Sequence, residues 1–116
     1  DYLHISCWDA FKRSQTYPED ARTLTEWFSA YKDKLAPIIS TGKVWSTKDA
    51  QALLNQGADL IGVARAGIGH PDWPKGMHDL NYDPQVPPFT TAQLKKAQLS
   101  VKFIDYMRNW EGFVAD

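Results

Sequence analysis

The fold of this chain is decided by residues 37–66, which read PIISTGKVWSTKDAQALLNQGADLIGVARA. Two short apolar runs, residues 37–41 and 59–63, are bounded by glycine and polar residues and predict strands. Between them, a helical pattern of apolar residues begins after a capping residue, Ser46 or Thr47. A strand, a helix and a second strand in this order predict a parallel βαβ unit with a right-handed crossover.

A further strand and helix precede this unit. Residues 2–6 predict a strand, and a polar loop follows. Thr23 and Glu26 form a capping box, after which apolar side chains recur at helical spacing and predict an amphipathic helix with one buried stripe. The stripe consists of Leu24, Trp27, Phe28, Tyr31 and Leu35. All three predicted strands alternate little between apolar and polar residues, so we expect both faces of the parallel sheet to be buried.

The last part of the chain, residues 77–116, predicts a tail that ends in a helix. Its first half holds three prolines and little periodicity, which indicates an extended connection. Thr90 and Gln93 form another capping pair, and spaced apolar residues then predict one final helix that runs toward Trp110.

Composition excludes several classes of partner. The 116 residues carry a formal net charge of -1, so no positive field attracts nucleic acid or an anionic membrane. No apolar run is long enough to span a bilayer, and the first residues have no signal-peptide pattern. Cys7 is the single cysteine, which excludes an internal disulfide and indicates a reducing, cytoplasmic location.

Two positions at strand ends suggest a phosphate site. Gly42 follows one predicted strand, and Arg65 follows the next. In (β/α)₈ barrels, the loops after the seventh and eighth strands often bind phosphate through converging backbone N–H groups. A glycine lets the backbone approach the phosphate oxygens, and an arginine adds a forked pair of donors. We therefore expect these two residues to face one anion.

The same segments resemble a known family. Residues 37–50, 57–66 and 70–74 resemble the last two βα units of the NADH:flavin oxidoreductase, or Old Yellow Enzyme, family, and residues 2–6 resemble its sixth barrel strand. The resemblance implies an α/β fold in which residues 1–116 form the C-terminal portion, about the last three βα units, of a (β/α)₈ TIM barrel.

The resemblance also implies a function. The parent protein would be an FMN-dependent NAD(P)H oxidoreductase similar to ene-reductases, and this chain would contribute the FMN phosphate-binding loops. Gly42 and Lys43 would offer backbone contacts, Ala64 a backbone N–H, and Arg65 both its backbone and its guanidinium. The family usually has glycine before this arginine, so the backbone at Ala64 must suit a residue with a Cβ.

No catalytic residue of that family falls within this chain. FMN and NAD(P)H would be held largely by a missing N-terminal part, so we expect the chain alone to be inactive. The strand-like run at residue 2, without a lead-in, is typical of a chain cut from a longer one. Two alternatives stay open: another phosphate-binding TIM barrel, or a non-catalytic α/β half-domain that forms a homo-oligomer through its open sheet edges.

The remaining candidate residues favour structural roles. We expect His4 to be a hydrogen-bonded core histidine and Cys7 a small buried apolar residue. His70 and His78, with nearby aspartates, match no metal-site spacing, so we expect no metal. The five tryptophans are too scattered along the chain for a stacking groove, and core and interface packing is the better interpretation.

Overall fold

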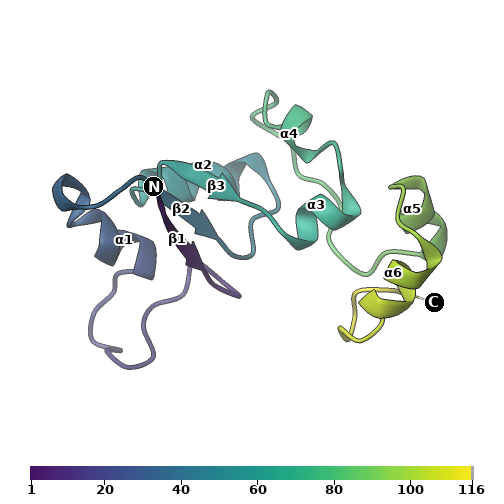
Figure 1. Cartoon of the computed structure of the whole chain (residues 1–116), viewed down its shortest axis with the longest axis horizontal. Coiled ribbons are helices and arrows are strands. Elements are labelled where there is room, and N and C mark those ends of the chain that lie inside the picture. Colours follow the sequence, from purple (N-terminus) through teal and green to yellow (C-terminus); the bar gives the residue numbers. More distant parts are fainter. Residues whose placement is uncertain (116) are drawn as a thin grey trace.

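The chain forms a small α/β structure around one parallel sheet. The computed structural model describes residues 1–115. Three strands, β1 (Leu3–Ser6), β2 (Ile38–Thr41) and β3 (Leu60–Gly62), lie side by side in this order (Figure 1). Both strand pairs are parallel, which confirms the predicted βαβ arrangement.

Six short α-helices and one 3₁₀ helix accompany the sheet. They are α1 (Leu24–Ser29), the 3₁₀ helix η1 (Lys32–Lys34), α2 (Thr47–Asn55), α3 (Arg65–Gly69), α4 (Trp73–Gly76), α5 (Thr91–Lys96) and α6 (Val101–Met107). In Figure 1 the sheet with α1 and α2 forms one end of the molecule, α5 and α6 form the other, and α3 and α4 lie between. Within the described residues, the helices are too short or too polar to cross a bilayer.

Helix α2 begins and ends as predicted. The Ser46 side chain accepts a hydrogen bond from the Asp49 N–H, and the Asp49 carboxylate accepts one from the Ser46 N–H. At the other end, Gly57 has a φ of 106°, a conformation that favours glycine, and its N–H donates to the Leu54 carbonyl. These local bonds fix both ends of the helix that connects β2 to β3.

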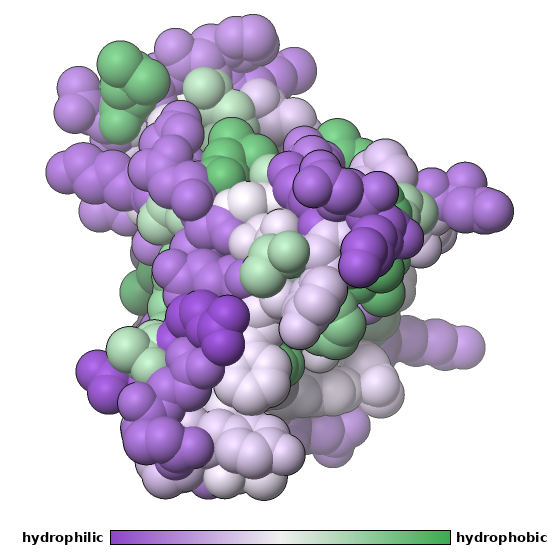
Figure 2. All heavy atoms as spheres, turned by 90° about the vertical axis from the view of Figure 1, so that its left-hand side faces the viewer, coloured by the Kyte–Doolittle hydropathy of each residue, from purple (hydrophilic) through white to green (hydrophobic). Residues whose placement is uncertain are grey.

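Helix α1 has the predicted capping box at Thr23, but the predicted buried stripe is wrong. Leu24 and Phe28 are exposed, and the residue of α1 that is buried is Thr25. Its hydroxyl shares a 2.7 Å hydrogen bond with the Ser40 hydroxyl of β2 inside the protein. Thr25 therefore lies on the side of α1 that meets the sheet. Figure 2 shows the end of the molecule that includes α1, where hydrophobic side chains emerge among hydrophilic ones.

The sheet is covered on one face, so the expected burial of both faces is wrong for this chain. Ile5, Ile38 and Ser40 share the covered face and are buried. His4 and Leu60 lie on the opposite face and are exposed. We call this opposite face the bare sheet face; it comprises His4, Ser6, Ile39, Thr41, Leu60 and Gly62.

The single C-terminal helix that we predicted is in fact two helices, α5 and α6. Gln98 has a φ of 66°, which ends α5, and the N–H of Leu99 returns to the Leu94 carbonyl in a typical helix C-cap. The Ser100 side chain then accepts from the Phe103 N–H and begins α6. The apolar spacing continues across the break because both helices pack on the same core.

The tail packs onto the rest of the chain through aromatic residues. Phe89 is buried, and its N–H donates to the Phe113 carbonyl while the two rings meet edge to face at 5.4 Å. The Phe89 ring also lies 6.4 Å from the Trp45 ring and meets the His70 ring edge to face at 5.6 Å. These contacts hold α5 and α6 near the loops that follow the strands.

Candidate functional site

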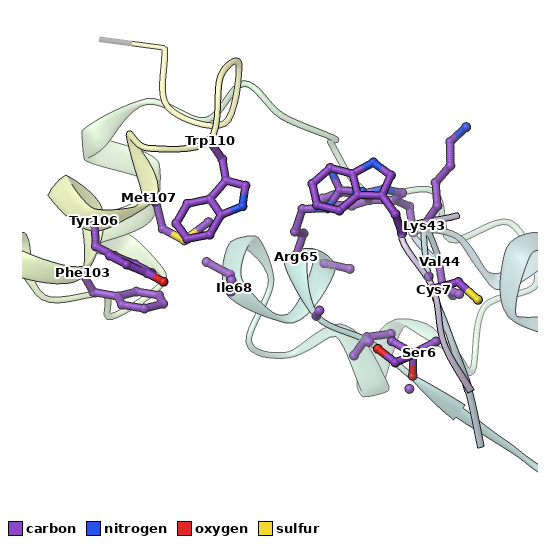
Figure 3. A pocket seen from close by; sticks show the side chains of 18 residues that line it. Ser6, Cys7, Lys43, Val44, Arg65, Ile68, Phe103, Tyr106, Met107 and Trp110 are labelled. Atoms are coloured by element: carbon purple, nitrogen blue, oxygen red, sulfur yellow. The ribbon is translucent and has the colours of Figure 1, made fainter. Parts of the chain in front are cut away.

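A cavity of about 300 Å³ lies at the carboxyl ends of the three strands. Its lining comes from the segments after β1, β2 and β3 on one side and from α6 on the other (Figure 3). All four residues predicted to bind the cofactor line it: Gly42, Lys43, Ala64 and Arg65. Parallel strands end at the same edge of a sheet, and this places the two predicted loops around one space.

Gly42 is required by the way two loops pack together. Its φ is 147°, and a Cβ at this position would lie 2.5 Å from the Cys7 carbonyl oxygen and 2.9 Å from the Ala10 nitrogen. The Ala10 N–H donates to the Gly42 carbonyl at 3.2 Å, which ties the loop after β1 to the loop after β2. The glycine therefore has a packing role that is independent of any ligand.

Lys43 faces the cavity with its backbone, while its side chain points elsewhere. Its φ of 57° turns the chain sharply after Gly42. Figure 3 shows the side chain extending away from the cavity, and the ammonium pairs with Asp9 at 3.2 Å. Burial acts to raise the pKa of Asp9, but hydrogen bonds from the Phe11 N–H and from Lys43 outweigh it and hold that pKa below its ordinary value. The ion pair thus neutralises the lysine's charge.

Ala64 and Arg65 lie at the junction between β3 and α3: Ala64 is the N-cap of α3 and Arg65 is its first residue. Ala64 has a φ of -123° and a ψ of -87°, so the backbone here does not adopt the positive φ that favours glycine. In the part of the chain that the structure describes, no hydrogen bond uses the backbone N–H of Gly42, Lys43, Ala64 or Arg65. These donors remain available to a ligand in the cavity.

The guanidinium of Arg65 lies over an aromatic ring instead of beside a carboxylate. It sits 4.3 Å from the centre of the Trp8 ring, and within residues 1–115 it forms no ion pair. Arg22 offers a contrast, since it lies 5.2 Å from the Trp27 ring but also pairs with Asp20 at 2.7 Å. Arg65 therefore carries an uncompensated positive charge and free donors at the cavity.

This arrangement has the chemistry of an anion receptor. Backbone N–H groups and one guanidinium can share the oxygens of a phosphate, and such charge-assisted bonds are stronger than neutral ones. The structure brings the four predicted residues together, while their binding of FMN stays a prediction.

The sequence interpretation missed the far wall of the cavity. Phe103, Tyr106, Met107 and Trp110 line it, and Trp8 lies on the side of the strands. Three of the tryptophans that we assigned to core and interface packing, Trp8, Trp45 and Trp110, thus border one cavity. The spacing of positions 103, 106 and 110 along the predicted helix was the available signal, because it places three aromatic rings on one side, although α6 itself ends at Met107 and Trp110 follows in the next turn.

Two nearby residues differ from their expected roles. His4 is exposed on the bare sheet face, where it bonds the Thr41 hydroxyl at 2.8 Å, so it is not a core residue. Cys7 is half-buried and lines the cavity. Burial, followed by the negative charge of Asp9, raises the pKa of the Cys7 thiol, which keeps it protonated and poorly nucleophilic at neutral pH.

Comparison with known proteins finds NADH-dependent oxidoreductases. No protein-family model matches the chain. The chain is 36% identical over 76 residues to the NADH:fumarate oxidoreductase of Klebsiella pneumoniae (strain 342), a match that covers 63% of this chain and 8% of that protein. It is 29% identical over 73 residues to a probable NADH-dependent flavin oxidoreductase of Bacillus subtilis (strain 168), covering 63% of this chain and 20% of that protein.

A third relative agrees with these two. The NADH:acrylate oxidoreductase of Vibrio harveyi is 29% identical over 83 residues, covering 68% of this chain and 8% of that protein. Part of the chain is therefore similar to distant relatives named as NADH-dependent oxidoreductases, which supports the resemblance to the NADH:flavin oxidoreductase family over that part. The chain matches between 8% and 20% of the length of these three curated relatives.

Proposed function

We propose that this chain is the C-terminal portion of a (β/α)₈ TIM barrel in an FMN-dependent NAD(P)H oxidoreductase of the Old Yellow Enzyme type. In this proposal it contributes the loops that bind the FMN phosphate. The observation that carries the proposal is the single cavity lined by Gly42, Lys43, Ala64 and Arg65. The names of three distant relatives support it, since all three include NADH and one includes flavin.

The residues around the cavity fit a phosphate. The Arg65 guanidinium has no carboxylate partner in the described chain, so two phosphate oxygens can take its forked donors. The backbone N–H groups of Gly42, Lys43 and Ala64 would donate to the remaining oxygens. FMN, when bound, would accept hydride from NAD(P)H and pass it to an acceptor. The chain's own part in that reaction is to bind and orient the cofactor.

The acceptor is proposed from the names of the relatives. Two of them act on fumarate and acrylate according to their names, and both molecules are alkenes conjugated to a carboxylate. This supports an ene-reductase-like parent enzyme. The proposal places the groups that protonate the alkene outside these 116 residues, so the chain alone is expected to have no turnover.

The phosphate site can be tested on the chain itself by NMR titration with inorganic phosphate. We expect the Arg65 side-chain Nε–H signal and the amide signals of Gly42 and Ala64 to shift together. Replacing the arginine, Arg65→Ala, should weaken phosphate binding about tenfold or more, because charge-assisted bonds contribute roughly 1.5–3 kcal/mol. The matched control is Arg22→Ala, which removes an arginine that also lies on a tryptophan but is neutralised by Asp20.

Two outcomes would count against this proposal. Equal weakening by Arg65→Ala and Arg22→Ala would show a general charge effect instead of a site. Absence of flavin absorbance in the purified full-length protein, with phosphate binding intact, would favour a different phosphate-binding barrel.

The bare sheet face favours a second candidate function. Leu60 is 56% exposed there, and the outer edges of β1 and β3 have no strand beside them within the described residues. If the chain is a non-catalytic α/β half-domain that associates with itself, a second copy would cover the bare sheet face and pair with the open edges of β1 and β3. The two candidates differ in what covers this face: other parts of one barrel, or a second copy of the chain.

A further inference from the structure

A second cavity lies away from the strand ends, between the end of α3, the start of α4 and helix α5. Its volume is about 400 Å³, which is within the range of small-ligand sites, and it shares no lining residue with the cavity at the strand ends. Helices α3 and α5 contact each other beside it. We call this space the tail cavity; its lining includes His70, Asp72, Gln85, Phe89, Gln93 and Lys96.

Hydrogen bonds between segments far apart in the sequence hold one wall of the tail cavity in place. The Gln85 backbone carbonyl lies 2.8 Å from His70 Nε2, and the Gln85 side-chain oxygen accepts a bond from the Gln93 amide at 2.7 Å. The Gln85 side-chain amide donates to the Pro88 carbonyl at 3.0 Å. The Phe89 ring, which is buried, meets the His70 ring edge to face at 5.6 Å. The cavity therefore combines a fixed polar wall with an apolar surface.

Two opposite charges border the tail cavity without neutralising each other. Asp72 is the N-cap of α4, but its side chain makes no capping hydrogen bond, and Lys96 is the last residue of α5. Within residues 1–115, neither side chain forms an ion pair or a hydrogen bond with any group. Both are exposed, as charged residues usually are. They differ from isolated surface charges because they border one cavity whose wall is fixed.

We propose that the tail cavity binds a small zwitterion, an α-amino acid with an apolar side chain. The ammonium group of this ligand pairs with the Asp72 carboxylate and its carboxylate pairs with the Lys96 ammonium, in charge-assisted hydrogen bonds. Gln93 lies three residues before Lys96, on the same side of α5, and donates one of its two amide N–H groups to Gln85. Its other N–H can donate to the ligand carboxylate. The Phe89 ring gives the apolar side chain a surface to contact.

The pair of charges selects against ligands that carry one charge. An anion at Lys96 is opposed by the nearby negative charge of Asp72, and a cation at Asp72 is opposed by Lys96. A zwitterion neutralises both side chains. This inference goes beyond the proposed function, and because the two cavities share no residue, the amino-acid site and the phosphate site are tested independently.

The test titrates the chain with L-leucine and with two analogues that each lack one charge. One analogue, 4-methylpentanoate, has no ammonium group, and the other, 3-methylbutylamine, has no carboxylate. Binding is followed through the NMR signals of the Gln85 and Gln93 side-chain amides. We expect leucine to bind at least about tenfold more tightly than either analogue, because each analogue loses a charge-assisted bond.

Two substitutions separate the ends of the ligand. Lys96→Met should weaken binding of leucine and 4-methylpentanoate about tenfold without weakening 3-methylbutylamine, and Asp72→Asn should weaken leucine and 3-methylbutylamine without weakening 4-methylpentanoate. Both side chains are exposed and make no hydrogen bonds in the described chain, so the variants are expected to fold. The matched control is Lys95→Met, which removes the neighbouring lysine of α5 that does not line the tail cavity.

Each result decides for or against the amino-acid site. Opposite analogue preferences in Lys96→Met and Asp72→Asn, with no effect of Lys95→Met, support it. The site is overturned if leucine binds no more tightly than the analogues, or if the two lysine variants lose affinity equally. It is also overturned if leucine leaves the Gln85 and Gln93 signals unmoved.

Discussion

At the scale of single residues, the loop after β2 depends on the absence of a side chain at position 42. Replacing it, Gly42→Ala, should lower the free energy of unfolding by about 1–3 kcal/mol, because the new Cβ would overlap the Cys7 carbonyl and the loop would have to move. Chemical denaturation of the two proteins measures the difference.

A second glycine provides the control for this prediction. Gly112 also has a positive φ, 74°, but nothing lies within 4 Å of the position of its missing Cβ. Gly112→Ala should therefore carry only the backbone cost, about 1 kcal/mol. If both substitutions destabilise the protein equally, close packing against Cys7 is not the reason for glycine at position 42.

The sequence was sufficient to predict that Gly42 and Arg65 lie close to one space, because parallel strands end at the same edge of a sheet and each residue follows a strand. It was not sufficient to place Trp8 beside Arg65 or α6 across from both. Those contacts join segments far apart in the chain, and spacing within one helix does not say which surface the helix will face.

At the scale of helices and strands, the break between α5 and α6 depends on Gln98. Its φ of 66° is unfavourable for a residue with a Cβ, so Gln98→Gly should raise the free energy of unfolding by about 0.5–1 kcal/mol. A neighbouring substitution, Lys96→Gly, lies inside α5 and should lower it by a similar amount. Thermal denaturation of both variants measures these changes. If Gln98→Gly lost stability as Lys96→Gly does, the positive φ at Gln98 would not be an unfavourable conformation.

Helix ends were predicted better than helix faces. The capping boxes predicted at Thr23 and Thr90 are present, since each depends on side-chain and backbone groups three residues apart, and Ser46, one of two predicted caps, begins α2. The buried side of α1 was predicted incorrectly: the side chain of α1 that is buried is Thr25, which hydrogen-bonds Ser40 of β2, while Leu24 and Phe28 are exposed. Periodicity records which residues are apolar, while the partner element decides which of them are covered.

At the scale of the whole molecule, the bare sheet face predicts self-association of the chain on its own. Sedimentation at increasing concentration should show larger species, because exposed apolar surface such as Leu60 gains from being covered. Leu60→Lys should shift the chain toward monomer. Leu80→Lys is the control, since Leu80 is even more exposed but lies outside the sheet. A monomer at all concentrations would argue against the self-associating half-domain.

The parallel arrangement of the three strands could be predicted from the sequence. The exposure of one face of the sheet could not. Strand, helix and strand follow from composition and spacing along the chain. Burial of a face depends on what is packed against it, and among residues 1–115 the helices pack against one side. Apolar strands with little alternation therefore predicted two covered faces where the chain covers one.

The two outer strands of the sheet are different from each other, and this governs how copies could join. β1 of one copy can extend the parallel ladder along β3 of the next, since both run in the same direction. Such head-to-tail addition uses two unlike surfaces, and it leaves the same two surfaces free after every step. Unless the chain of copies closes into a ring, growth of this kind ends in filaments and not in a pair of fixed size.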